Sequence, residues 1–339
     1  MAAKKFRGML RVIVGPAARG DGSDSFPIGV NMFVVCGEAL MDVFGAGDTA
    51  SGMALDARVG GSPFNAAVGL ARLAQPVTFL SAVSRGFLGE RLMRALRDES
   101  VNTSAVQRND APTTLGLVGL DANRVPSYSF YGEGGADRQL SLDALTALPP
   151  GVRAIHLGSY ATVVEPIAST LRALVEREHA RTLIAYDPNI RLNVEPELAR
   201  WRDMLDWMLP RAHLLKISDE DLQLLLPGTG AEEFAAAALR RGVKLVVVTR
   251  GAEGAVAWTP QVHTSVPTVQ VEVIDTVGAG DTFQAALLTW LAEHARLSAP
   301  ALEALSRAEL EAALGFAARA AAITCSRRGA DMPRRSELS

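Results

Sequence analysis

The pentapeptide Gly-Ala-Gly-Asp-Thr occurs twice in the chain, at residues 45–49 and 278–282. The second copy follows a strand-like segment, and its glycines should lie in the turn before a helix N-terminus, where free N–H groups and the helix dipole attract phosphate. The helix is indicated by apolar residues at the spacing of a buried helical face, namely Phe283, Ala286, Leu287, Trp290 and Leu291. A carboxylate beside a phosphate is unfavourable unless it takes a proton from the attacking group, so Asp281 is predicted to be a general base.

The first copy lacks this context, because no helical pattern follows it. It is succeeded by a Gly-rich and then strand-like segment, which predicts the tip of a hairpin. Other glycine-loop chemistries are excluded by the sequence. Phe283 stands where a dinucleotide-binding fingerprint needs its third glycine, and the chain contains no G-x-x-x-x-G-K-[ST] loop and no H-E-x-x-H or C-x-x-C zinc motif.

The surrounding elements predict an α/β fold. After Leu140, short apolar runs alternate with helical stretches, a pattern typical of a doubly wound, mostly parallel sheet flanked by helices. Residues 32–44 are predicted to be one buried strand that alternates after Gly37. The hairpin-like segments at about 50–61 and 113–131 do not fit that sheet and are predicted to form a small β-sheet lid. Ser62 and Pro63 are predicted to be the N-cap and first residue of a helix.

Composition excludes several classes of protein. The 339-residue chain is 48% hydrophobic and 21% charged, with a net charge of −3, so a large core can form. The sequence has no basic patch that would indicate a nucleic-acid partner. It also has no apolar run long enough to span a membrane. The two cysteines stand in apolar surroundings and predict reduced thiols in the cytoplasm. We expect a flexible extension over residues 1–31, one large α/β domain over 32–333 and a C-terminal tail over 334–339.

Several spaced motifs together resemble one family. The segments "VGGSPFNAAVGLARL" (59–73) and "DTVGAGDTF" (275–283) are similar to the two signatures of the ribokinase-like PfkB carbohydrate kinases. Between them, "DPNIR" (187–191), "KISDED" (216–221) and "TRGAEG" (249–254) follow in the family's order. The resemblance covers about residues 33–333. It implies a ribokinase-like fold and the ATP-dependent phosphorylation of a sugar hydroxyl.

The resemblance also implies a role for each matching residue. Asp281 would be the catalytic base, beside an anion hole formed by the amides of Gly278, Ala279 and Gly280. The residues implied for the sugar are Asp42, Gly60, Gly61, Asn65 and Arg191. The residues implied for the nucleotide are Lys216, Thr249, Gly251 and Gly254.

Two cation sites are implied less directly. Family members usually position Mg²⁺ through water with Asn and Glu three residues apart, where this chain has Ser218 and Asp221. The alternative reading of Asp221 is an exposed acidic helix start. A potassium ion behind the anion hole would be held by Asp275 and the backbone of residues 327–329.

The substrate is predicted from likeness within the family. Residues 127–138, 187–191 and 325–333 most resemble bacterial fructokinases, which favours a neutral ketose, fructose above all. A 2-keto-3-deoxygluconate kinase is the alternative, with Arg191 and Arg138 as partners of the sugar acid, although Asp42 would repel it. A nucleoside kinase and a non-catalytic sugar-binding regulatory protein remain further alternatives. Open lid edges predict a homodimer.

Overall fold

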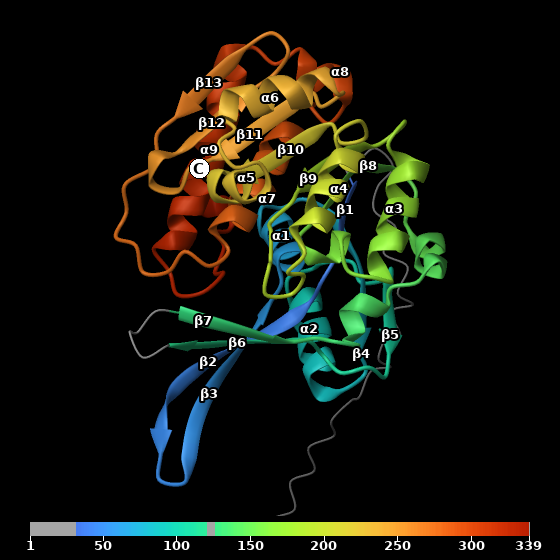
Figure 1. Ribbon diagram of the computed structural model, residues 1–339, viewed down its shortest axis with the longest axis vertical. Helices are drawn as coiled ribbons and strands as arrows, with labels where there is room; N and C mark the ends of the chain where they lie inside the picture. The colour runs from blue at the N-terminus through green and yellow to red at the C-terminus, as the bar shows by residue number, and fades with distance from the viewer. Residues whose placement is uncertain (1–31, 121–125, 339) are drawn as a thin grey trace, which may run out of the picture.

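A computed structural model of the chain describes residues 32–120 and 126–338, and the predicted extension over residues 1–31 lies outside this part. The described residues form two sheets, one of nine strands and one of four (Figure 1). From one edge to the other the strands of the large sheet are β5 (Val106–Asn109), β4 (Val77–Ser84), β1 (Met32–Cys36), β8 (Val152–Gly158), β9 (Leu183–Asp187), β10 (Leu214–Ser218), β11 (Leu245–Thr249), β12 (Ala255–Trp258) and β13 (His263–Val266). The pairs β11–β12 and β12–β13 are antiparallel, and the other pairs are parallel.

Helices cover both faces of the large sheet, which confirms the predicted doubly wound fold. Alternate residues of β1 show the two faces, since Phe33 and Val35 enter one apolar cluster and Val34 and Cys36 enter the other. The first cluster includes residues of α1 (Ser62–Arg72), α2 (Phe87–Asp98), α7 (Ala279–Glu293), α8 (Ala299–Glu303) and α9 (Arg307–Cys325). The second includes residues of α3 (Ile167–Glu178), α4 (Leu198–Met208), α5 (Asp219–Leu225) and α6 (Ala231–Arg240). The short 3-10 helices are η1 (Ala136–Gln139), η2 (Leu142–Ala147), η3 (Tyr160–Thr162), η4 (Gly251–Glu253) and η5 (Arg335–Glu337).

The small sheet is the predicted lid, with one strand more than the sequence indicated. Its order is β3 (Gly52–Gly60), β2 (Leu40–Thr49), β6 (Leu115–Leu120) and β7 (Pro126–Tyr131), and the β2–β3 hairpin extends away from the helical layers (Figure 1). The prediction of one strand over residues 32–44 was wrong. Gly37 has φ of 144°, and a Cβ there would lie 2.4 Å from the ring of Pro63, so the chain leaves the large sheet at this residue and enters the lid. The first pentapeptide copy lies at the end of β2 in the hairpin, as predicted.

The end of the chain packs against the domain, although residues 334–339 were predicted to be a separate tail. Arg334 forms an ion pair with Glu99, and Arg335 forms one with Glu293. Leu338 is buried in the cluster that contains α7 and α9. The domain therefore continues to residue 338. In the described part of the chain, no helix combines the length and apolar character needed to cross a bilayer.

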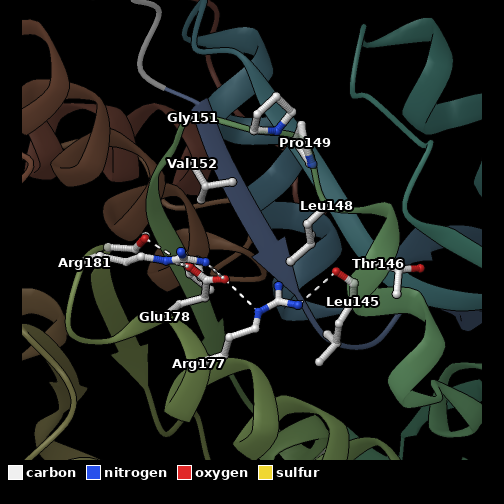
Figure 2. A pocket seen from close by; sticks show the side chains of 12 residues that line it. Leu145, Thr146, Leu148, Pro149, Gly151, Val152, Arg177, Glu178 and Arg181 are labelled. Atoms are coloured by element: carbon white, nitrogen blue, oxygen red, sulfur yellow. Dashed lines mark hydrogen bonds and ion pairs between the residues drawn. The ribbon is translucent and has the colours of Figure 1, made fainter.

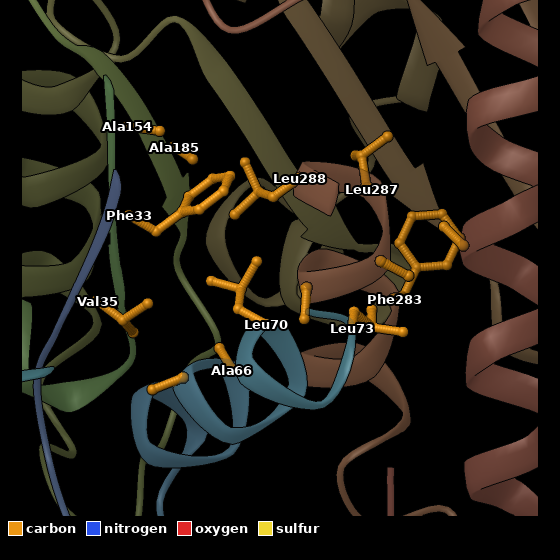
Figure 3. Close-up of a cluster of buried hydrophobic side chains, with 14 of the residues drawn as sticks. Phe33, Val35, Ala66, Leu70, Leu73, Ala154, Ala185, Phe283, Leu287 and Leu288 are labelled. Atoms are coloured by element: carbon orange, nitrogen blue, oxygen red, sulfur yellow. The ribbon is translucent and has the colours of Figure 1, made fainter. Parts of the chain in front are cut away.

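Helices α1 and α7 carry residues of the candidate site, and their packing on the large sheet fixes where those residues lie. Leu70 of α1 is fully buried, and Figure 3 shows it beside Phe33 of β1 and Leu288 of α7. Because tightly packed interiors relax only partly around a lost side chain, this contact is sensitive to truncation.

We expect Leu70→Ala to destabilise the protein by about 2–5 kcal/mol, through lost burial and a residual cavity. The matched control is Leu142→Ala, because Leu142 is 58% exposed. Thermal or urea unfolding of both variants measures the difference. Equal stability of the two variants would contradict this description of the core.

Candidate active site

The candidate site lies where the carboxyl ends of the parallel strands meet. The chain order along the sheet reverses between β1 and β8, with β4 and β5 on one side and β9 to β11 on the other. In open α/β sheets, ligands bind in the crevice at such a switch point. Glu38 follows β1, Ser159 follows β8, and Asp187 ends β9. The fold thus brings these polar residues together at the carboxyl ends of the parallel strands.

The second pentapeptide lies at the N-terminus of α7, as predicted, and this helix start is the candidate anion cradle. Gly278 is its N-cap with φ of 76°, and no side chain caps the helix. A Cβ on Gly278 would lie 2.5 Å from Cβ of Ala330, so a larger residue would not fit there. A Cβ on Gly280 would lie 3.1 Å from the Lys216 ammonium, which therefore sits next to the cradle. Backbone N–H groups, the helix dipole and a nearby cation all favour a bound phosphate.

Asp281 lies in the first turn of α7, half-buried and held at both carboxylate oxygens. The hydroxyl of Ser62 donates to Oδ1 at 2.6 Å, and the amide of Asn65 donates to Oδ2 at 2.9 Å. Burial raises the pKa of Asp281, whereas the hydrogen bonds from Ser62 and Asn65 and the charge of Lys216 lower it. A half-buried carboxylate that two donors orient beside an anion cradle is suited to accept a proton.

The role of Ser62 differs from the prediction. It was predicted to be an N-cap, but α1 begins at Ser62, its N-cap is Gly61, and no side-chain cap bond is present. Asn65 was predicted to contact sugar, and its amide also donates to Asp281. No sequence signal separates this use of Ser62 from capping, because serine at a helix start is ordinarily a cap.

A buried ion pair lies next to the cradle. The Lys216 ammonium donates to Oδ2 of Asp187 at 2.7 Å, and both side chains are buried. Oδ1 of Asp187 has no partner, and the two charges act on Asp281 with opposite signs. A buried charge is strongly unfavourable without its partner, so each member of the pair holds the other in place. Lys216, predicted to bind nucleotide, is thus placed at the phosphate cradle.

Asp42 lies flat on the lid sheet between glycines of the two neighbouring strands. A Cβ on Gly60 would lie 2.2 Å from its Oδ2, and one on Gly116 would lie 2.9 Å from its Oδ1. Burial raises the pKa of Asp42 to about 6, Arg191 lowers it, and Asp281 raises it further. Gly116 was missed by the sequence analysis, because its importance depends on strand pairing between β2 and β6.

Further polar groups gather around Arg191, which follows β9. Its guanidinium donates to the carbonyl of Ile190 at 2.9 Å, and its charge acts on Asp42 and Glu38. Glu38 is buried beside Gly61, its pKa is raised to about 8 by burial, and its Oε2 has no partner. Glu38 was also missed, because a glutamate after an apolar run carries no motif of its own.

The other residues predicted for the nucleotide lie farther along the sheet, at the carboxyl end of β11. Thr249 ends β11, and the N–H of Arg250 donates to the carbonyl of Gly254 at 2.8 Å, which closes a tight turn. A Cβ on Gly254 would lie 2.1 Å from the carbonyl oxygen of Val266, so glycine is needed there. Gly251, with φ of 48°, begins η4 inside this turn.

The residues predicted for cations are engaged with backbone. Oδ1 of Asp221 accepts a bond from the N–H of Ile190 at 3.3 Å, and burial raises its pKa to about 6. Asp275 accepts bonds from the N–H groups of Val277 and Gly329 at 3.1 and 2.8 Å. Asp275 thus joins the two segments predicted to surround potassium. Among residues 32–120 and 126–338, no cluster of three or more His, Cys, Asp or Glu could hold a metal ion.

Comparison with known proteins decides the family. A family model described as "pfkB family carbohydrate kinase" matches residues 30–336. The chain belongs to the pfkB family of carbohydrate kinases. This confirms the resemblance seen in the sequence and the sugar phosphotransferase class that it implied.

Individual pfkB relatives agree with the family. A fructokinase of Rhizobium leguminosarum bv. trifolii is 35% identical over 260 residues, which are 77% of this chain and 79% of the relative. The structure of an ATP-bound fructokinase from Xylella fastidiosa has a TM-score of 0.81 at 27% identity, covering 91% of this chain and 96% of that one. A fructokinase double mutant from Vibrio cholerae, with fructose, ADP and potassium bound, has a TM-score of 0.77 at 26% identity, covering 91% and 97%.

A large cavity lies elsewhere in this pfkB kinase. It measures about 600 Å³, and Figure 2 shows Val152, at the amino end of β8, among the residues that line it. Strands β8 and β9 begin here and end at the candidate site. Among the described residues that line it, the one carboxylate is that of Glu178, which accepts bonds from both Arg177 and Arg181. The charged side chains of this cavity are thus engaged with one another, whereas unpartnered oxygens of Glu38 and Asp187 lie at the switch point.

Gly60→Ala tests the arrangement around Asp42. The added methyl group would displace that carboxylate, and we expect the KM for sugar to rise roughly 10- to 100-fold, as when hydrogen bonds to a charged group are lost. The KM for nucleotide should change little. Gly45→Ala, in the same hairpin, is the control, because a Cβ there meets nothing within 4 Å. Steady-state kinetics in both substrates measures the effect, and an unchanged sugar KM in Gly60→Ala would refute the assignment.

Proposed function

We propose that this protein is an ATP-dependent fructokinase. The observation that carries the proposal is the position of Asp281, held by Ser62 and Asn65 in the helical turn that forms the phosphate cradle. Relatives that match this chain over most of its length are fructokinases, and this supports fructose as the sugar.

The reaction follows from these positions. The amides of Gly278, Ala279 and Gly280 bind the γ-phosphoryl group of ATP, and the adjacent Lys216 offsets its charge. Asp281 takes the proton of the attacking sugar hydroxyl. The sugar oxygen forms a bond to the γ-phosphorus while the bond from that phosphorus to the bridging oxygen breaks, and ADP leaves. Thr249, Gly251 and Gly254 bind the rest of the nucleotide at the end of β11.

A neutral sugar fits the charges of the pocket better than a sugar acid. Asp42 and Glu38 present carboxyl groups near Arg191, which is already attracted to both. Asp42 accepts hydrogen bonds from sugar hydroxyls, while Gly60 and Gly61 let the sugar lie against the backbone. A carboxylate substrate would be repelled by Asp42.

Cations complete the proposal. Mg²⁺ would neutralise the phosphates of ATP, and Asp221 would hold it through its water shell, as this small ion prefers. The unpartnered oxygen of Asp187 fits a further water of that shell. Potassium, bound to the related Vibrio enzyme, would lie near Asp275 and the backbone of residues 327–329.

We further propose a cytoplasmic homodimer. Cys36 and Cys325 are free thiols, which suits a reducing compartment. Met53 and Leu55 of the lid strand β3 are 64% and 54% exposed, and β3 is an edge of its sheet. Exposed apolar side chains on an open edge favour pairing with a second lid.

The duplicated pentapeptide supplies a matched test. Asp281→Asn removes the base and should lower kcat for fructose about 10²- to 10⁴-fold, with fructose binding largely retained. Asp48→Asn makes the same change in the other copy, where the side chain is exposed in the lid hairpin, and should leave kcat unchanged. ADP release and calorimetric sugar binding measure both effects.

The assay also includes 2-keto-3-deoxygluconate and nucleosides as acceptors. Fructose should give the highest kcat/KM. Near-normal turnover by Asp281→Asn would refute the catalytic assignment, and preference for the sugar acid would refute fructose as the substrate.

A further inference from the structure

The hydroxyl of Ser62 has one donor proton, which it donates to the candidate base, and its oxygen caps no helix end. We propose that Ser62 is a positioning residue that keeps the Asp281 carboxylate ionised and oriented for proton transfer. The inference rests on the proposed function, in which Asp281 is the base.

Local backbone geometry directs the hydroxyl. Gly61, with φ of 107°, is the N-cap of α1, and Ser62 and Pro63 are the first helical residues. A Cβ on Gly61 would lie 2.9 Å from the carbonyl oxygen of Glu38, so the chain turns tightly there. Ser62 therefore stands one position beyond the capping residue, and its side chain extends to α7 instead of back to its own helix.

The carboxylate is fixed at both ends. Ser62 binds Oδ1 at 2.6 Å and Asn65 binds Oδ2 at 2.9 Å, so rotation of the group would break one or both bonds. A carboxylate offers about four acceptor positions, and two donors leave positions free for the sugar hydroxyl. The 2.6 Å distance is typical of a hydroxyl bound to a charged oxygen, the stronger class of hydrogen bond.

The groups around Asp281 act on its pKa in opposite directions, so hydrogen-bond donors to its carboxylate affect the balance. Burial and the charge of Asp187 disfavour its ionised form, while Lys216 favours it. Asp42, on the lid, interacts unfavourably with the same carboxylate. Loss of the Ser62 donor should therefore raise the pKa of Asp281, because a hydrogen bond to the ionised form has been removed.

The same short segment serves substrate and base. Gly60 and Gly61 lie in the proposed sugar subsite, directly before Ser62, and Asn65 follows one helical turn later. The orientation of the base is thus tied to the segment against which the sugar lies. A displacement of this segment would misplace substrate and base together.

The test is the pH dependence of kcat/KM for fructose at saturating ATP in Ser62→Ala, Ser62→Cys and Ser62→Thr. In Ser62→Ala the acid limb should move to higher pH, so that activity there falls about tenfold further below wild type than on the plateau. Ser62→Thr keeps a hydroxyl and should keep the wild-type limb. Ser62→Cys, with a weaker donor, should lie between the two. Ser169→Ala, at an exposed site on α3, is the control and should match wild type.

A uniform loss of activity at every pH, with an unmoved acid limb, would overturn the positioning role. The cysteine and threonine variants keep the test decisive if Ser62→Ala folds poorly. Failure of the proposed function gives a different result, since Asp281→Asn would then retain turnover whatever the profile of the Ser62 variants.

Discussion

The proposed mechanism depends on keeping a carboxylate ionised in the same helical turn that holds a phosphate. Asp281 and the amides of residues 278–280 share the N-terminus of α7, where the helix dipole favours both anions. The dipole alone cannot remove their mutual repulsion. Lys216 supplies a cation beside the cradle, and Ser62 and Asn65 supply donors to the carboxylate. Proton transfer then relieves the repulsion in the reaction itself.

This constraint explains why the charges near the cradle are buried and paired. Lys216 is useful as a fixed cation only if its ammonium cannot swing into water, and its bond to Asp187 prevents that motion. Asp187 ends β9 and Lys216 lies in β10, so neighbouring strands of the sheet set the distance between them. The packing of α1 against α7 sets the distance from Ser62 to Asp281 in the same way.

The sequence could predict features that depend on local patterns. The α/β alternation, the second pentapeptide at a helix start and the hairpin position of the first copy each rest on spacing within a short segment. Features that depend on pairing between distant segments were missed. Gly116 faces Asp42 only because β6 pairs with β2, and Ser62 reaches an aspartate 219 positions away. The need for glycine at the break between β1 and β2 likewise depends on the ring of Pro63, 26 positions away in the sequence.

The most direct test of the central claim is a crystal structure with fructose, ADP, Mg²⁺ and aluminium fluoride, which mimics the transferring phosphoryl group. The account predicts that the fluoride lies over the amides of residues 278–280. It also predicts that one hydroxyl of fructose lies in line with the aluminium and within about 3 Å of a carboxylate oxygen of Asp281. A fluoride group bound away from α7, or a fructose hydroxyl in line but out of reach of Asp281, would contradict it.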